Sequence, residues 1–151
     1  MLTDVFGRSG ESALVDRLRG RKDALSFVAA VDDQIVGHAI FHSVNVVEAP
    51  RPIVASALGL LAVHPTRRSM GTGSRLVNHG LAECRVAGAG LVFVLGAAAF
   101  YQRHGFVPAG PRGFRCRWRV PEGSLLVVEV VPGELAGGQG IVGYPREYDD
   151  E

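Results

Sequence analysis

Apolar residues near the start of the chain recur at helical spacing. Leu14, Val15 and Leu18 lie between Gly10 and Gly20, and the charged residues of this segment would lie on the opposite side of a helix. This pattern is typical of an amphipathic helix with one buried face. A short helix is therefore predicted before the first strand.

Two extended segments follow and predict an antiparallel hairpin. Residues 25–31 are apolar and rich in side chains that favour strands, residues 32–34 are polar, and residues 35–47 resume the extended pattern. A short polar turn between two such segments is the usual signature of a β-hairpin.

The middle of the chain predicts a strand, a glycine-containing turn and a helix in that order. Residues 53–63 form a long apolar run, which His64 and Pro65 end because proline lacks the N–H needed for sheet pairing. Beyond the turn, apolar residues return at three- and four-residue spacings from Leu76 to Gly88. That spacing indicates a helix with one buried face.

The last part of the chain is predicted to complete the sheet. Residues 91–95 are wholly apolar, as in a strand covered on both faces, and residues 97–103 predict a short helix. Residues 114–120 alternate apolar side chains with arginine, and residues 125–131 are apolar again, so the two segments predict a second hairpin. The glycine-rich residues 133–151 are expected to be irregular.

Composition limits the classes of function. The 151 residues carry a net charge of +1, which gives no general field for binding nucleic acid or anionic lipid, and no apolar run is long enough to span a membrane. Cys84 and Cys116 lack the spacing of a metal site, and the start of the chain lacks a signal-peptide pattern. We therefore expect a cytoplasmic protein without a metal and without nucleic-acid or membrane partners. No linker divides residues 1–151, which are predicted to form a single α/β domain.

The segment between the predicted strand and helix is a candidate anion site. The first turn of a helix leaves backbone N–H groups unpaired and carries partial positive charge, so the amides from about Ser69 to Ser74 can surround a diphosphate. Gly71 and Gly73 let the anion approach the main chain, and Arg68 adds a cation. The pattern alone also fits a simple turn and helix cap. A P-loop and a dinucleotide fingerprint are disfavoured because the required lysine and third glycine are absent.

These residues resemble the GNAT superfamily of N-acetyltransferases. Arg68, Gly71 and Gly73 fit its [QR]-x-x-G-x-[GA] signature, and residues 101–106 fit its later Tyr-x-[RK]-x-Gly-Phe motif. The ending Gly-x-x-x-Tyr-Pro, residues 140–145, is similar to an uncharacterised bacterial branch of predicted acetyltransferases. The resemblance implies an α+β fold with one mixed, mostly antiparallel sheet flanked by helices. The family's first strand is expected to be missing, because Met1 falls where its first helix starts.

The resemblance also implies a cosubstrate and roles for individual residues. Acetyl-CoA would be the acyl donor, an unidentified amine the acceptor, and Tyr101 the proton donor to the departing thiolate. This sequence departs from the family pattern at residues 96–98, which are Gly-Ala-Ala. Related sequences often carry residues there that contact the cofactor. The residues expected to bind the cofactor are Leu61, Ala62 and Val63, which would contact pantetheine, and Arg68, Ser69, Met70, Gly71, Thr72, Gly73 and Ser74, which would hold the pyrophosphate.

The group that deprotonates the amine is not evident from the sequence. Many relatives use a glutamate on the central strand, but residues 53–63 contain no carboxylate. His38, His42, His64 and Glu48 could serve directly or through water, and the pattern does not choose among them.

Four arginines form the one concentrated basic segment of the sequence. Arg115, Arg117 and Arg119 alternate along a predicted strand, with Arg112 just before it and Trp118 expected to point the opposite way. This face could be simply solvated, or could bind an acidic acceptor or the cofactor's 3′-phosphate.

The preferred hypothesis is an acyl-CoA-dependent N-acetyltransferase that acts by direct attack in a ternary complex. The alternatives are a non-catalytic acyl-CoA-binding or regulatory module, and a structural partner that keeps only the fold. Apolar edge strands would also allow a homodimer.

Overall fold

The computed structural model of the protein describes residues 22–145 and residue 148. The helix predicted around residues 14–18 and the expected absence of a strand before it lie outside the described residues. The remaining sequence-based predictions can be compared with the structure element by element.

The predicted N-terminal hairpin is confirmed. Strand β1 (Leu25–Val31) pairs antiparallel with the long strand β2 (Gln34–Val47), and Val31 faces Gln34 across a two-residue turn. The turn residues Asp32 and Asp33 have φ values of 50° and 67°. Both positions of a type I′ turn require positive φ, which aspartate tolerates better than most residues, so the local sequence favours this turn.

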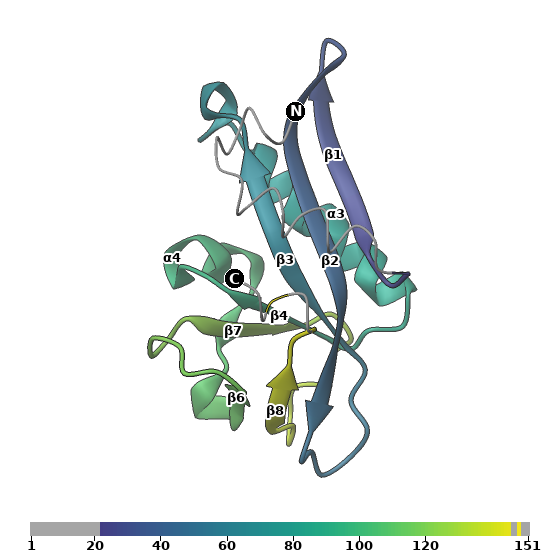
Figure 1. The fold of residues 1–151 in the computed structure, drawn as a ribbon, viewed down its shortest axis with the longest axis vertical. Coiled ribbons are helices and arrows are strands. Elements are labelled where there is room, and N and C mark those ends of the chain that lie inside the picture. The colour runs from purple at the N-terminus through teal and green to yellow at the C-terminus, as the bar shows by residue number, and fades with distance from the viewer. Residues whose placement is uncertain (1–21, 146–147, 149–151) are drawn as a thin grey trace.

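One mixed sheet contains all the described strands, in the order β5-β7-β4-β3-β2-β8-β6, with β1 also paired to β2 (Figure 1). Strand β3 (Ala55–Val63) is antiparallel to β2 and parallel to β4 (Leu91–Leu95), which is antiparallel to β7 (Leu125–Glu129). The short strand β5 (Val107–Pro108) pairs with the outer edge of β7. The predicted central strand and the mostly antiparallel sheet are therefore confirmed.

The predicted C-terminal hairpin is wrong. Strand β6 (Phe114–Cys116) is short and does not pair with β7; it pairs in parallel with β8 (Gly140–Gly143), which lies in the tail predicted to be irregular. The other edge of β8 pairs with Asn45–Val47 of β2. The side chains of residues 125–128 are all buried. A strand that is buried on both faces fits the interior of a sheet, and β7 lies there between β4 and β5, not at an edge as in a terminal hairpin.

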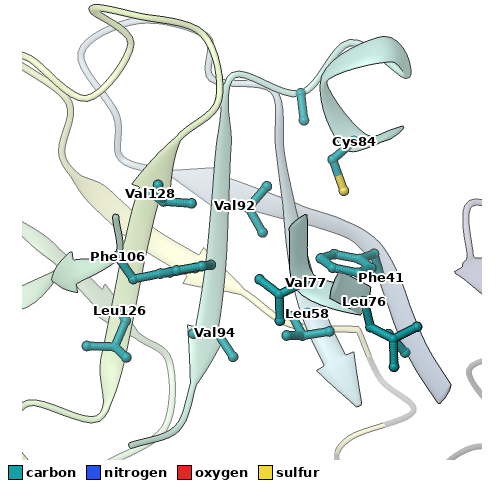
Figure 2. Close-up of a cluster of buried hydrophobic side chains, with 12 residues drawn as sticks. Phe41, Leu58, Leu76, Val77, Cys84, Val92, Val94, Phe106, Leu126 and Val128 are labelled. Carbon is teal, nitrogen blue, oxygen red and sulfur yellow. The ribbon is translucent and has the colours of Figure 1, made fainter. Parts of the chain in front are cut away.

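Helix α3 (Thr72–Val86) packs on one face of the sheet, as the helical spacing predicts (Figure 1). Its buried side chains, which include Leu76, Val77 and Cys84, belong to the cluster of buried hydrophobic side chains drawn in Figure 2. Gly80 allows this close packing: a Cβ atom there would lie 2.0 Å from Cε1 of Phe41. The helix therefore requires a glycine at its closest contact with β2.

Alternating residues along the strands divide the interior into two cores. Val92 and Val94 of β4 contribute to the core beneath α3, whereas Leu91 and Phe93 contribute to a second core. Successive side chains of a strand point to opposite faces, so the second core lies on the face opposite α3. The connecting elements complete these layers: 3-10 helix η1 (Pro65–Arg67) before α3, helix α4 (Ala98–Tyr101) with η2 (Gln102–His104) after β4, and η3 (Gly110–Arg112) before β6.

Candidate functional site

Strands β3 and β4 pair over only part of their length. The pairing runs from Ala55 with Leu91 to Leu58 with Val94, and β3 then continues to Val63 without β4 beside it. At the same point the β2–β3 register shifts, leaving Gly59 without a partner on β2. We call this place, where β3 leaves β4, the strand opening.

Beyond the strand opening, one edge of β3 is not paired with another strand. The His64 N–H donates to the Val36 carbonyl on β2 at 2.7 Å, and an antiparallel ladder places such bonds at every second residue. The backbone groups of Ala62 therefore point toward β2, and those of Leu61 and Val63 point away from it. The Val63 carbonyl indeed accepts a bond from Nε of Arg68, at 3.3 Å. Leu61 and Val63, but not Ala62, present their amide groups to the open side.

The turn before α3 carries a series of open backbone donors. The first helical hydrogen bond runs from the Arg75 N–H to the Gly71 carbonyl, at 3.0 Å. Within the described part of the chain, the N–H groups from Ser69 to Ser74 donate to no protein acceptor. Ser69 and Gly71 have φ values of 66° and 84°, and such left-handed residues in a turn direct successive N–H groups into a concavity that suits an anion.

The turn and the unpaired edge of β3 line one groove of about 640 Å³. Eight of the ten predicted cofactor-binding residues line it; Met70 and Thr72 do not, since Met70 is exposed and the Thr72 side chain is buried. The structure adds three lining residues that were not predicted to bind the cofactor, Arg67, Phe100 and Arg103. The lining residues are Leu61, Ala62, Val63, Arg67, Arg68, Ser69, Gly71, Gly73, Ser74, Phe100 and Arg103.

Three guanidinium groups make this groove strongly basic. Arg67 is the last residue of η1, Arg68 follows it in the turn, and Arg103 belongs to η2, where its guanidinium lies 5.9 Å from the centre of the Phe100 ring. A signal for both missed arginines exists in the sequence, because Arg67 precedes the first motif and Arg103 is part of the second. The groove therefore combines unpaired amides with positive charge, the arrangement that binds phosphate groups.

Gly73 lines the groove between the turn and β3. A Cβ atom at this position would lie 3.5 Å from Cζ of Phe100, 3.6 Å from Cγ2 of Val63 and 3.9 Å from Cδ2 of Leu61. These are ordinary van der Waals distances, so a methyl group would fit the fold. A larger side chain would fill the space between the turn and the edge of β3.

Tyr101 does not line the groove but lies directly beside it. Its ring packs against Phe100 at 4.9 Å and Phe106 at 5.5 Å, and a Cβ atom on Gly96 would lie 2.6 Å from its Cε2. Gly96 follows the last residue of β4, so Tyr101 lies on the β4 side of the strand opening. Burial raises the pKa of the Tyr101 phenol to about 12. The side chain is consequently a neutral hydrogen-bond donor at physiological pH.

The four groups considered as proton acceptors occupy very different places. His38 is buried and bonded to Oγ of Ser26 at 2.6 Å, and His64 accepts the Thr66 N–H at the start of η1. Glu48 is exposed at the end of β2. His42 lies at the strand opening, since a Cβ atom on Gly59 would lie 2.9 Å from its ring.

The predicted arginine face is not a single surface. Strand β6 ends at Cys116, so Arg117 leaves the strand alternation and lies 4.6 Å from the centre of the Trp118 ring. Arg117 also donates to the Tyr144 carbonyl at 2.9 Å. The expectation that Trp118 points away from the arginines is therefore wrong for Arg117, while Arg115 stays exposed on β6.

No cluster of three or more potential metal ligands occurs among the described residues. Across the same residues, no helix has both the length and the apolar character needed to cross a membrane.

The comparisons with known proteins agree with the fold. Residues 22–108, more than half of the chain, match the family model described as an acetyltransferase (GNAT) domain. The chain is 37% identical over 124 residues to an uncharacterised N-acetyltransferase of Escherichia coli strain K12, YjhQ, covering 80% of this chain and 68% of that protein. This chain belongs to the GNAT family of N-acetyltransferases.

Two solved structures extend the similarity over nearly the whole chain. One is the GNAT family N-acetyltransferase YhbS of Escherichia coli in complex with CoA, with a TM-score of 0.88, 31% identity, and coverage of 98% of this chain and 82% of that chain. The other is a GNAT family acetyltransferase from Brucella melitensis in complex with acetyl-CoA, with a TM-score of 0.72, 30% identity, and coverage of 95% and 81%.

Proposed function

We propose that this protein transfers the acetyl group of acetyl-CoA to an amine, on a small molecule or a protein, by direct attack in a ternary complex. The observation that carries the proposal is the series of open N–H groups from Ser69 to Ser74, which face a basic groove beside an unpaired strand edge. The complexes of YhbS with CoA and of the Brucella protein with acetyl-CoA support the same cosubstrate here.

The groove offers partners for the phosphates and for the pantetheine of the cosubstrate. The amides of residues 69–74 bind the pyrophosphate, and Arg67, Arg68 and Arg103 neutralise its charge and that of the 3′-phosphate. The outward backbone groups of Leu61 pair with the pantetheine amides as an added strand would. This arrangement brings the thioester toward the strand opening.

Tyr101 is proposed to protonate the leaving group. The amine lone pair attacks the thioester carbon, a C–N bond forms, and the C–S bond breaks to give a thiolate, whose conjugate acid has a pKa near 8.5. Because the pKa of Tyr101 is about 12, its phenol stays neutral and donates a hydrogen bond that becomes proton transfer as sulfur gains charge. The resulting phenolate takes up the extra proton of the positively charged nitrogen that the attack creates, which leaves the neutral amide and the phenol, so the step balances.

A non-catalytic acyl-CoA-binding module is the second candidate. It is favoured by residues 96–98, which lack the contact that relatives often carry, and by the absence of any carboxylate from β3. Such a module would bind acetyl-CoA through the same amides without transferring the acetyl group.

We also propose a single domain, a cytoplasmic location and a homodimer. The single sheet formed by the described strands supports one domain over residues 1–151. Cys84 and Cys116 are buried free thiols, which supports a cytoplasmic location. Strand β1 exposes Val28, which supports a homodimer through this edge.

Calorimetry with acetyl-CoA, combined with thiol release on a panel of amines, tests the proposal. The panel contains a polyamine, an amino acid and a peptide with a free N-terminus. Binding with turnover is the expected result. Binding without turnover on any amine would favour the non-catalytic module, and absence of binding would refute both.

A further inference from the structure

A histidine and a tyrosine from distant parts of the chain meet at the strand opening. Nε2 of His42 lies 2.5 Å from the hydroxyl of Tyr148, although 106 positions separate the two residues. A Cβ atom on Gly59 would lie 2.5 Å from that hydroxyl and 2.9 Å from the same Nε2. The His42–Tyr148 pair therefore lies directly over the residue at which β3 leaves β4.

Two hydrogen bonds of the His42 ring indicate which of its nitrogens carries the proton. Nδ1 lies 3.1 Å from the Ser43 carbonyl, an acceptor, so Nδ1 is the N–H donor of the neutral ring. Nε2 then holds the lone pair and accepts the Tyr148 hydroxyl proton. A phenol oxygen that donates its own proton to an imidazole is also a hydrogen-bond acceptor, so it can take up a proton while it gives one away.

The pair and Tyr101 lie on opposite faces of the sheet. Tyr148 packs with the second core, whereas Tyr101 packs with the core beneath α3. Each tyrosine lies against a glycine at the strand opening: Tyr148 against Gly59 of β3, and Tyr101 against Gly96 after β4. A thioester at this opening would have one hydroxyl on either side.

An aromatic cluster holds the pair in place. The Tyr144 ring is buried and lies 5.0 Å from the Tyr148 ring and 6.0 Å from His42, and Trp118 lies 5.8 Å from Tyr148. Tyr144 directly follows β8, whose pairing with Asn45–Val47 brings the end of the chain beside His42. The Gly-x-x-x-Tyr-Pro segment thus has a physical role, which is to dock Tyr148 on β2.

We propose that the His42–Tyr148 pair accepts the proton of the acceptor ammonium, the step for which β3 supplies no carboxylate. The ammonium passes a proton to the Tyr148 oxygen as the Tyr148 proton passes to Nε2 of His42. The products are a neutral amine and an imidazolium, and His42 later returns its proton to solvent. This inference rests on the proposed function, because the neutral amine is the nucleophile of acetyl transfer.

Several ionisable groups surround the pair and belong in any account of its pH dependence. The Tyr144 hydroxyl lies in the same cluster, and burial raises its pKa well above the usual value. The Arg117 guanidinium packs on Trp118, and the Asp23 carboxylate accepts the Ser43 N–H at 3.2 Å. None of these groups replaces His42 as the acceptor of the Tyr148 proton.

The test compares His42→Gln with Tyr148→Phe and with the control His79→Gln. Glutamine keeps an acceptor for Tyr148 but takes up no proton, phenylalanine keeps the ring and its packing, and His79 is an exposed histidine of α3. Loss of a general base costs about 10²- to 10⁴-fold, so we expect His42→Gln to lose at least about 100-fold in kcat/KM at pH 7. Tyr148→Phe should lose about 10-fold or more, and the control should match the wild type.

Two further readouts separate a proton acceptor from a structural role. The loss should shrink as the pH approaches the pKa of the acceptor amine, and should vanish for an amine that is already neutral at the assay pH. The acetyl-CoA dissociation constant from calorimetry should stay unchanged. A loss that is equal at every pH and for both kinds of amine would overturn the proposal, as would full activity of both variants.

Failure of the proposed function gives a different result. In that case the wild type itself would neither bind acetyl-CoA nor release thiol with the neutral amine. If His42→Gln does not fold, as judged by thermal unfolding, Tyr148→Phe answers the same question, because it removes only the hydroxyl.

Discussion

Replacing Gly73 by valine should abolish acetyl-CoA binding and leave the fold intact. The Cβ atom meets Phe100, Val63 and Leu61 at 3.5 to 3.9 Å, so it causes no clash, but the two methyl groups beyond it enter the groove. The open amides of the turn would then be screened from the pyrophosphate. Gly73→Ala is the graded form of the same change, with one methyl group beside the anion.

The magnitude follows from the hydrogen bonds at risk. A hydrogen bond to a charged group contributes about 1.5 to 3 kcal/mol, which corresponds to roughly 10- to 150-fold in the dissociation constant. Gly73→Ala should weaken binding by about this factor, if it displaces one amide contact. The same variant should raise the unfolding temperature by about 2 °C, because alanine is favoured over glycine in a helix by about 0.5 to 1 kcal/mol.

Isothermal calorimetry with acetyl-CoA and thermal unfolding without ligand measure the two effects. Gly110→Val is the matched control, since a Cβ atom on Gly110 meets nothing within 4 Å and the residue lies outside the groove. Gly73→Ala should therefore raise the unfolding temperature while it weakens acetyl-CoA binding. If Gly73→Val bound acetyl-CoA within threefold of the wild type, the pyrophosphate could not lie at this turn.

Three other predictions concern chemistry and packing. Tyr101→Phe should lower kcat about 100-fold or more with little change in acetyl-CoA affinity, measured by steady-state thiol release and calorimetry. Gly80→Ala should lower stability by about 1 to 3 kcal/mol in urea unfolding, because the added methyl overlaps the Phe41 ring; unchanged stability would mean that α3 does not pack as described. Burial raises the pKa of the thiols of Cys84 and Cys116 to about 11, so both should resist alkylation at pH 8 until the protein unfolds. These raised pKa values also stabilise the fold below pH 9 and cease to do so as the pH rises through 11, so stability should fall across that window in pH-dependent urea unfolding.

Local features of the sequence were sufficient to predict the central part of the site. Proline at position 65 ends β3, and glycines at 71 and 73 begin α3 with open amides, so the strand, turn and helix follow from neighbouring residues. The hairpin of β1 and β2 was predictable for the same reason, since its turn residues and its alternation are adjacent in the chain.

Pairing partners and distant contacts were decided only by the tertiary structure. An apolar run such as residues 125–129 can fill any interior position of a sheet, so nothing local shows that it lies between β4 and β5 or that β8 joins β2. His42 and Tyr148 carry no signal of their meeting, because a contact across 106 residues depends on how the whole sheet closes. The sequence by itself determined most of the elements and the turn with open amides before α3, where interactions are short-range. The folded sheet decided which side chains meet at the strand opening, because each strand could bury its apolar face against more than one neighbour.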